Sequence, residues 1–301
     1  MKLTLHQLRT FSAIARFGNL NQASEELCLS KGALSQTLQQ LEQQLATELF
    51  DRVQRRLKLN SQGRLLLPLA EEMLSRAQEI EQLFGSYDHQ PEVLNIGASQ
   101  TIGNYMLPTL LASQPTLCQA KIQIANTQTL CQQLLRFELD MALVEGQNTH
   151  AELQATPWQQ DEMILIAAPN HPLLDQGNVS LADLDDQPWV LREAYSGSRE
   201  QFERHIRPAL TNVNQVMEFS SLESIMLAVE NGLGLSFISL IAAQARLELG
   251  RIARLPYPNH FYRQLSIVQH RHKYASKGMK TLTEHFLNAT ETRRNKKGDG
   301  Q

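Results

Sequence analysis

Long apolar runs are missing from this chain of 301 residues. No stretch of about 18 consecutive apolar residues occurs, which excludes a membrane-spanning helix. Cysteine is scarce: Cys28, Cys118 and Cys131 are odd in number and lack metal-ligand spacing, so they suit a reducing compartment better than a disulfide framework. The first residues, MKLTLHQLRTF, contain no apolar signal-peptide core. We therefore expect a cytoplasmic protein with no membrane partner.

Common catalytic motifs are also missing. The sequence contains no Gly-x-Ser-x-Gly turn, no Gly-x-Gly-x-x-Gly turn and no phosphate-binding loop. His270 and His272 form a close pair with no acid or cysteine beside them, so we interpret them as surface or core residues and not as metal ligands. We therefore expect neither an enzyme nor a metal or other cofactor.

Charge is unevenly distributed along the chain. The net charge is -3, yet residues 1–64 contain nine basic and five acidic side chains, so that the remainder is acidic. A basic segment on an acidic body favours a polyanionic partner for that segment alone. Nucleic acid is the first candidate.

Residues 19–45 form two short helical patterns separated by a tight break. In the second, Leu34, Leu38, Leu41 and Leu45 recur at steps of four, three and four, and Ser30 stands where an N-cap is needed. The opposite face carries hydroxyl, amide and ammonium groups that bind phosphates and base edges. This is the pattern of a helix-turn-helix that reads a major groove, although an ordinary amphipathic helix hairpin fits this stretch alone equally well. The residues predicted to contact DNA on this helix are Ser30, Lys31, Gly32, Ser35, Gln36 and Gln39.

An alternating pattern from Val53 to Leu59 predicts a short two-stranded wing directly after this helix. Arg55 and Arg56 fall within this pattern and Arg52 directly precedes it, and all three are predicted to contact the phosphate backbone. Such contacts set affinity and salt dependence but not sequence preference. Residues 1–61 are thus predicted to be a winged helix-turn-helix DNA-binding domain.

Residues 62–84 predict one long helix, with apolar positions that step by three or four. These positions are Leu66, Leu69, Met73, Ala77, Ile80 and Phe84. The repeat is close to a coiled-coil seam over three heptads, so we expect the helix to pair with a second copy of the chain. A polar stretch rich in Gly and Pro follows, and we assign residues 62–90 to a linker and dimerisation helix with its hinge.

From Val93 onward, short apolar strands alternate with amphipathic helices, which predicts an α/β body with mostly parallel sheets. The spacing suits two lobes within residues 91–287: lobe I at about 91–164 and 267–287, and lobe II at about 165–266. Residues 288–301 lack apolar periodicity and are predicted to be a disordered tail.

Ligands of open α/β folds lie beyond the carboxyl ends of strands, against helix N-termini. Two hydroxyl-rich stretches fit that position, one in each lobe, and Glu145 and the turn at Asn126-Thr127 are further candidates. Plain helix capping explains either stretch alone, but their paired position favours binding. The predicted effector-binding residues are Ser99, Gln100, Thr101, Glu145, Ser196, Ser198 and Arg199.

Residues 3–67 resemble the winged helix-turn-helix head of the LysR-type transcriptional regulators. The residues that carry the resemblance are Leu8, Phe11, Ala23, Leu27, Ser30, Ser35, Leu41, Glu42, Leu45, Leu49, Phe50, Arg52 and Gly63. Where the family usually has Gln-Pro or Gln-Ser after the serine, this chain has Lys31-Gly32, and it has Ala46-Thr47 where a glycine is usual. These departures bear on the operator sequence and not on the family.

The body resembles the effector domain of the same family, which is similar to periplasmic binding proteins and closes on a small ligand between its lobes. The stretches GASQTIGNYMLP, PWVLRE, SGSRE and NGLGLSFIS resemble a branch with regulators of sulfur metabolism, sulfite-responsive regulators and regulators of carbon fixation. The resemblance implies a homodimer or tetramer on an imperfect inverted repeat of double-stranded DNA, with RNA polymerase as a further partner. It also implies a small-molecule effector, for which a small inorganic or carboxylate anion is the first hypothesis.

Two alternatives remain open. A redox-sensing regulator would use Cys118 and Cys131, but peroxide-sensing members of the family carry their reactive cysteines in the second lobe, where this chain has Ser196 and Ser198. A small-ligand binding protein without a regulatory role would not need the basic head.

Overall fold

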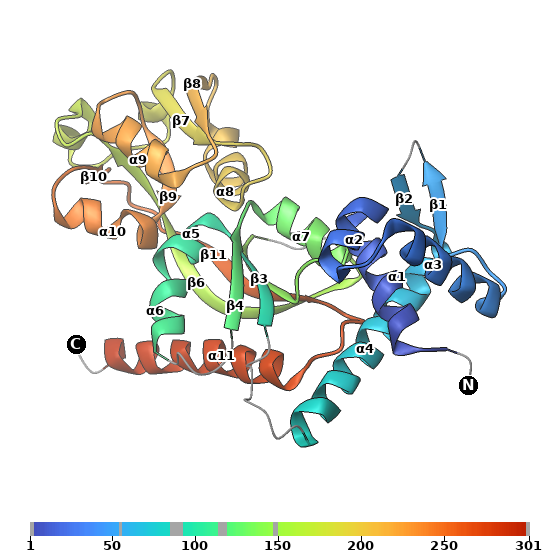
Figure 1. Ribbon diagram of the computed structural model, residues 1–301. Coiled ribbons are helices and arrows are strands. Elements are labelled where there is room, and N and C mark those ends of the chain that lie inside the picture. The colour runs from blue at the N-terminus through green and yellow to red at the C-terminus, as the bar shows by residue number, and fades with distance from the viewer. Residues whose placement is uncertain (1–2, 54–55, 85–92, 114–118, 147–149, 299–301) are drawn as a thin grey trace.

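The computed structural model describes residues 3–53, 56–84, 93–113, 119–146 and 150–298. The N-terminal head contains α1 (Leu5–Phe17), α2 (Leu20–Leu27) and α3 (Lys31–Leu45), followed by the antiparallel pair β1 (Phe50–Val53) and β2 (Arg56–Leu59). This arrangement confirms the predicted helix-turn-helix and its wing (Figure 1).

The caps of the head helices explain where the chain turns. The Ser30 hydroxyl accepts a hydrogen bond from the Ala33 amide at 3.2 Å and begins α3. Cys28 ends α2 and Ala46 ends α3, both with left-handed backbone, at φ 52° and 51°. A left-handed residue after a helix is most often glycine, which gives a physical reason for the glycine that the family usually has near Ala46.

The head has its own apolar core, in which Leu34, Leu38 and Leu41 of α3 pack against α1 and α2. Leu45, which the leucine pattern includes, is exposed instead because it lies in the last turn of α3, beyond this core. The buried leucines fix the opposite face of α3 toward solvent.

Helix α4 (Ser61–Phe84) is amphipathic with two apolar sides. Leu67 and Ala70 are buried in the core of the head. A second set stays exposed in the single chain: Leu65, Leu69, Met73 and Ile80, with 66, 59, 39 and 59% of their surface exposed. Leu69, Met73 and Ile80 of the predicted seam are therefore uncovered, whereas Leu66 packs on the core of the head.

The body contains seven helices and nine strands among its described residues, besides short 3-10 turns. In chain order they are β3 (Val93–Ala98), α5 (Gln100–Tyr105), α6 (Leu107–Ala112), β4 (Gln119–Ile124), α7 (Thr127–Leu135), β5 (Met141–Glu145), β6 (Leu153–Ala167), β7 (Pro188–Arg192), α8 (Gly197–His205), β8 (Asn214–Phe219), α9 (Leu222–Glu230), β9 (Ser236–Ser239), α10 (Leu240–Glu248), β10 (Ala253–Arg254), β11 (Phe261–His270) and α11 (Lys277–Gly298). Separate apolar cores form on either side of the cleft, around Trp158 in lobe I and Trp189 in lobe II.

The main sheet is mixed, with the order β10-β6-β11-β5-β3-β4 and β9 added on β6. Strands β4 and β5 are parallel to β3, but β6 and β11 pair antiparallel with each other from Phe261 and Met163 to His270 and Leu153. The expectation of mostly parallel sheets is therefore wrong for the centre of the body. The reason is that the two strands that cross between the lobes run in opposite directions, one out and one back.

The C-terminal helix α11 continues to Gly298, so residues 288–298 are helical where the sequence predicts a disordered tail. Met279, Leu282 and Phe286 bury one face of α11 on lobe I. A helix once nucleated extends readily into residues of fair helix propensity, so the absence of an apolar pattern did not end it. The predicted hinge at residues 85–92, Arg55 and Cys118 lie outside the described residues.

The head is docked on lobe I at the end of α7 (Figure 1). Phe137 follows this helix with φ 58°, and its ring is buried in the core of the head, beside the ring of His270 at 4.3 Å between centroids. The Lys273 ammonium lies 2.8 Å from Asp140 of lobe I and 3.9 Å from Glu71 of α4. One chain thus fixes its own DNA-binding head to one lobe. Within the described part of the chain, no helix combines the length and apolar character needed to cross a bilayer.

Candidate DNA-binding and effector sites

Helix α3 presents the predicted DNA-contacting face to solvent. Ser30, Lys31, Gly32, Ser35, Gln36 and Gln39 are all exposed. They lie opposite the buried leucines, and the first three turns of the helix contain no acid. Such a face can donate and accept hydrogen bonds at base edges and phosphates without repelling DNA.

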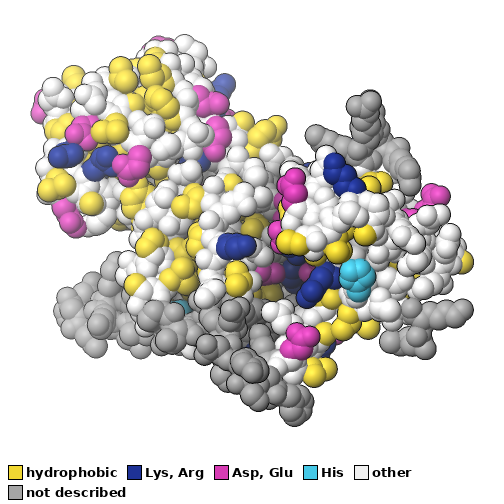
Figure 2. All heavy atoms as spheres, in the orientation of Figure 1, with side chains coloured by type: hydrophobic (Ala, Val, Ile, Leu, Met, Phe, Trp, Pro, Cys, Tyr) yellow, Lys and Arg dark blue, Asp and Glu magenta, His cyan; other side chains and the backbone are white. Residues whose placement is uncertain are grey.

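The entry of α3 is unobstructed. A Cβ placed on Gly32 would have the Ser30 hydroxyl, at 4.0 Å, as its nearest neighbour, so packing does not require glycine there. Arg52 and Arg56 fall in β1 and β2, next to α3, which is the place expected of a wing; their side chains, like Arg55, are outside the described part. On lobe II the visible face intersperses charges of both signs (Figure 2), so it offers no basic field comparable with a DNA-binding surface.

Four of the predicted effector residues meet in the inner cleft. Ser99, Thr101 and Glu145 come from lobe I and Ser198 comes from the first turn of α8 in lobe II, and all four are buried. The group at their centre is the side chain of Arg263, which the sequence reasoning missed. The sequence signal for Arg263 was a cation within a largely apolar strand. Charged residues are rarely fully buried unless they are paired, so such a residue indicates acidic partners nearby.

Arg263 is held by both lobes and by the crossing strand β6. Its Nε donates to Asp161 Oδ2 at 2.8 Å, and its Nη1 donates to Glu145 Oε2 at 2.5 Å and to Ser198 Oγ at 3.2 Å. Its Nη2 donates to Thr101 Oγ1 at 2.9 Å and also lies 2.7 Å from Asp161. The guanidinium therefore has acceptors for its whole fork of donors.

Glu145 fills the anion position that was predicted at the start of α5. Its Oε1 accepts hydrogen bonds from the Ser99 hydroxyl at 2.8 Å and from the Thr101 amide at 3.1 Å. These are the donors that a bound anion would use, and the carboxylate of the chain itself already occupies them.

Burial and charge act in opposite directions on the acids of this cluster. Burial alone would raise the pKa of Glu145, but Arg263 and the hydrogen bonds from Thr101 and Ser99 outweigh it, and the pKa is lowered. Burial raises the pKa of Asp161, Arg263 opposes this, and the neighbouring Glu145 charge adds to the rise. Two carboxylates share one guanidinium, so Glu145 holds the negative charge more firmly.

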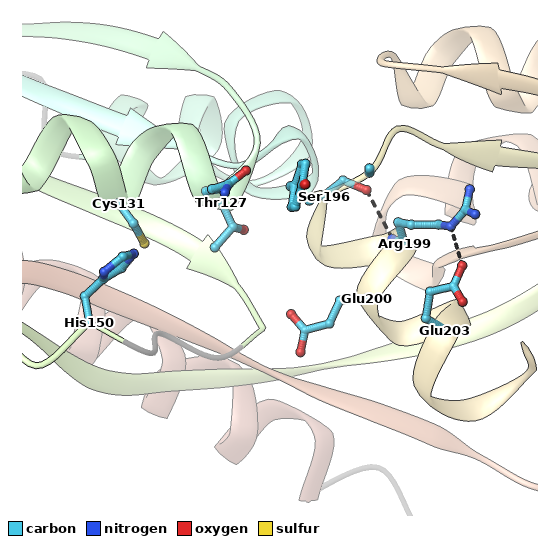
Figure 3. A pocket seen from close by; sticks show the side chains of 10 residues that line it. Thr127, Cys131, His150, Ser196, Arg199, Glu200 and Glu203 are labelled. Carbon is cyan, nitrogen blue, oxygen red and sulfur yellow. Dashed lines mark hydrogen bonds and ion pairs between the residues drawn. The ribbon is translucent and has the colours of Figure 1, made fainter. Parts of the chain in front are cut away.

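A more open hollow of about 590 Å³ adjoins this cluster. Thr127 and Gln128 of the first turn of α7 line one wall, while Ser196 and Arg199, at the start of α8, line the other (Figure 3). The first backbone amides of a helix have no hydrogen-bond acceptor within the helix. Both walls therefore present polar N–H groups or the side chains that cap them. The two helices come from different lobes. The sequence pattern pairs the start of α8 with that of α5, and the wall from α7 corresponds to the further candidate turn at Asn126-Thr127.

The charged side chains that line the hollow point in different directions. Arg199 points away from it and donates to Glu203 at 2.7 Å, whereas the Glu200 carboxylate faces the space (Figure 3) and accepts from Arg204 at 2.8 Å. Of the predicted effector residues, Ser196 and Arg199 thus belong to the outer hollow. Gln100 belongs to neither group, and its amide oxygen accepts from Asn104 at 3.2 Å.

Cys131 and His150 also line the hollow. Burial raises the pKa of Cys131 to about 11, so its thiol is protonated near neutral pH, unlike the thiolate of a reactive cysteine. Among the described residues no group of three or more His, Cys, Asp or Glu side chains is arranged to hold a metal ion.

An exposed recognition helix on a head, joined by a long helix to a two-lobed body with a polar hollow, defines a DNA-binding regulator that responds to a small molecule. Comparisons with known proteins agree. Residues 5–64 match the model of the bacterial regulatory helix-turn-helix protein, lysR family, and residues 88–291 match the LysR substrate binding domain.

Similar proteins cover nearly the whole chain. The uncharacterized HTH-type transcriptional regulator YeiE of Escherichia coli K12 is 37% identical over 290 residues, which are 95% of this chain and 97% of the relative. A probable RuBisCO transcriptional regulator of Cyanidioschyzon merolae is 31% identical over 300 residues, covering 96% and 99%. The structure of a full-length OxyR variant from Pseudomonas aeruginosa shares the fold, with a TM-score of 0.73 and 23% identity over 96% of this chain and 94% of that one.

The chain belongs to the LysR family of DNA-binding transcriptional regulators. It carries the effector-binding domain of that family, and the relatives that regulate RuBisCO agree with the carbon-fixation part of the predicted branch. Members of the family bind DNA and small-molecule effectors and oligomerise.

Proposed function

We propose that this regulator reads its operator with the exposed face of α3 and binds phosphates with the wing. The single observation that carries the proposal is that the buried leucines of α3 turn Ser35, Gln36 and Gln39 outward, next to the open entry at Lys31 and Gly32. The exposed apolar seam of α4 supports a dimer through this helix. Two heads related by a two-fold axis then require an imperfect inverted repeat.

Quantitative binding to operator DNA and to random DNA tests these roles. Ser35→Ala and Gln36→Ala should weaken operator binding by roughly tenfold and random-sequence binding much less, because base contacts carry the specificity. Arg52→Ala should weaken both and reduce the salt slope by about 1, since one phosphate contact is lost.

Gln44→Ala is the matched control, because Gln44 is exposed in the last turn of the same helix, away from the N-terminal end that enters the groove. An equal loss on operator and random DNA for Ser35→Ala would contradict the base-reading role.

The effector proposed for the hollow is a small polar molecule with an anionic group. The first turns of α7 and α8 offer N–H groups from both lobes, and helix N-termini attract anions. Because Glu200 faces the same space, a hydrogen-bond donor elsewhere on the effector suits it better than a second negative charge. Binding between the lobes would shift the population of lobe arrangements and, through the oligomer, the spacing of the heads on DNA.

Calorimetric titration with sulfite, sulfate and small carboxylates tests the anionic part. We expect at least one to bind, and Gln128→Ala to weaken it by removing an exposed side-chain amide from the wall of the hollow. Gln132→Ala is the control, because Gln132 is exposed one turn further along the same helix, outside the lining of the hollow. No heat from any anion at millimolar concentration would refute an anionic effector while leaving the DNA-binding role intact.

We also propose that the protein is cytoplasmic and has no enzymatic activity, and that it acts on RNA polymerase bound at the neighbouring promoter. The missing catalytic motifs support the non-enzymatic part, and a role on DNA is consistent with the cytoplasm. Transcription from an operator-promoter template with purified polymerase measures it directly, and identical output with and without the regulator would contradict the polymerase contact.

A further inference from the structure

The inner cleft is closed by contacts between the chain's own groups. A Cβ placed on Gly197, the first residue of α8, would lie 2.6 Å from the Cβ of Glu145, so the two lobes touch there. A Cβ on Gly146 would lie 2.5 Å from the Glu200 carboxylate. Gly197 is therefore required by the close approach of the lobes, which leaves no room for a molecule between β5 and α8. Gly146 is required by its left-handed backbone, at φ 83°.

Arg263 supplies the interactions that hold this approach. Its side chain is fully buried, and it joins Thr101 and Glu145 of lobe I to Ser198 of lobe II. Asp161, its other partner, accepts a further bond at 2.9 Å from Ser239, which caps α10 in lobe II. The chain's own guanidinium thus makes contacts to both lobes of the kind that a bound small molecule would make.

We propose that Arg263 is a built-in ligand of the cleft, which closes the lobes without an effector and determines which effectors the cleft admits. A planar guanidinium binds carboxylates through two donors at once, so no other side chain could satisfy Glu145 and Asp161 from one position. The side chain enters from β11, a strand that crosses between the lobes, so it is part of the connection itself.

The selectivity follows from charge and from donors already in use. Two carboxylates around one guanidinium leave an excess of negative charge in the inner cleft, and the Ser99 and Thr101 donors are engaged by Glu145. An anionic effector is therefore confined to the outer hollow, and the inner cleft is a site for a guanidinium-type cation. The confinement of an anionic effector to the outer hollow rests on the proposed effector function, whereas the cation site in the inner cleft does not.

Removal of Arg263 exposes that site to a probe. In Arg263→Ala, Glu145 and Asp161 face each other without a counter-ion, and breaking a buried ion pair in this way is strongly destabilising. We expect the melting temperature of the full-length protein to fall by roughly 10 °C or more, given ~2–4 °C per kcal/mol for a domain of this size. Guanidinium or methylguanidinium at low millimolar concentration should restore several degrees, because a ligand that binds only the folded state stabilises it.

Urea at the same concentration is one control, because it has the planar shape of guanidinium without its charge. Sodium chloride at the same concentration is the control for ionic strength. Neither should restore stability, and the native protein should gain nothing from guanidinium because Arg263 occupies the site. Arg254→Ala is the matched variant: Arg254 forms a 2.6 Å ion pair with Glu162, but on the partly exposed surface and without joining the lobes. It should lose little stability and show no rescue by guanidinium.

Hydrogen exchange measures closure of the lobes. Arg263→Ala should exchange faster at the start of α8 and the end of β5, and guanidinium should slow this exchange again. Arg263→Lys is the second variant, for use if the alanine variant does not fold. It keeps the positive charge but loses the planar guanidinium group with its several N–H donors. It should also exchange faster in these two segments.

The proposal is overturned if Arg263→Ala folds with unchanged exchange, if urea rescues it as well as guanidinium does, or if Arg263→Lys matches the native protein in exchange and melting temperature. Operator binding by the α3 variants is measured separately, so failure of the DNA-reading role and failure of the built-in ligand are distinguishable.

Discussion

Phe137 provides the most discriminating test of how the head is attached to the body. Its backbone is left-handed, at φ 58°, directly after α7, and its ring is 6% exposed in the core of the head. A non-glycine residue pays about 1–2 kcal/mol for this backbone, whereas burial of a phenylalanine ring in a core is worth about 3–5 kcal/mol relative to alanine. The ring contact outweighs the strain, so the strained conformation persists.

Two substitutions separate these contributions. Phe137→Ala loses the ring and keeps the strain, so we expect a loss of about 3 kcal/mol in stability of the docked head. Phe137→Gly loses the same ring but relieves the strain, so it should be more stable than the alanine variant by about 1 kcal/mol. This order is the reverse of that expected at an ordinary helical position, where glycine is the less stable of the two.

The assay can distinguish head from body. Trp158 and Trp189 both lie in the body, so tryptophan fluorescence in urea follows body unfolding, while hydrogen exchange of α1 follows the head. Both Phe137 variants should raise exchange in α1, alanine more than glycine, with a smaller effect on the fluorescence transition. Phe286→Ala, in the core of lobe I, is the control and should move the fluorescence transition. A glycine variant as unstable as the alanine variant, or less stable, would refute the strain argument.

Three further outcomes follow from the contacts. Gly63→Ala should lower the stability of the head by about 1–3 kcal/mol, because the new methyl group would collide with the Leu49 carbonyl oxygen; thermal unfolding with no change would contradict this. Ile80→Glu should shift sedimentation toward the monomer by placing a charge in the exposed seam, while Glu81→Gln beside it should not. The lowered pKa of Glu145 means that its stabilising contribution is complete above its unfolded pKa of about 4.3 and is lost as pH falls through the folded value. The stability difference between the native protein and Glu145→Gln, measured by urea unfolding, should therefore shrink on acidification, and a constant difference would contradict the assignment.

The head and the linker were predictable because their signals are local. The leucine spacing of α3, its Ser30 cap and the alternation of the wing each depend on residues close in sequence, and the structure confirms the elements they predict. The body was predictable as a class for the same reason. Its sheet was not, because pairing of β6 with β11 joins residues about a hundred positions apart, and no local pattern reports the direction in which such strands meet.

The residues that lie between the lobes were predictable in part for a similar reason. Hydroxyl groups before helices single out Ser99, Thr101, Ser196 and Ser198, because helix starts are readable from sequence, and all four lie between the lobes. Their contact with an effector stays a prediction. Which of these residues faces the open hollow depends on Arg263, a residue far from them in the sequence. Arg263 engages three of the predicted positions and leaves the hollow to the first turns of α7 and α8, and that partition exists only in three dimensions.

The position of β11 in the main sheet has a consequence for synthesis of the protein. This strand lies between β5 and β6, yet it is the last strand of the chain to be made. During translation the head can fold as soon as it emerges, whereas the facing edges of β5 and β6 must wait unpaired until lobe II and β11 have followed. Unpaired strand edges are sites of aggregation, so a chain terminated before Phe261 would keep a complete DNA-binding head attached to a body that cannot close its sheet.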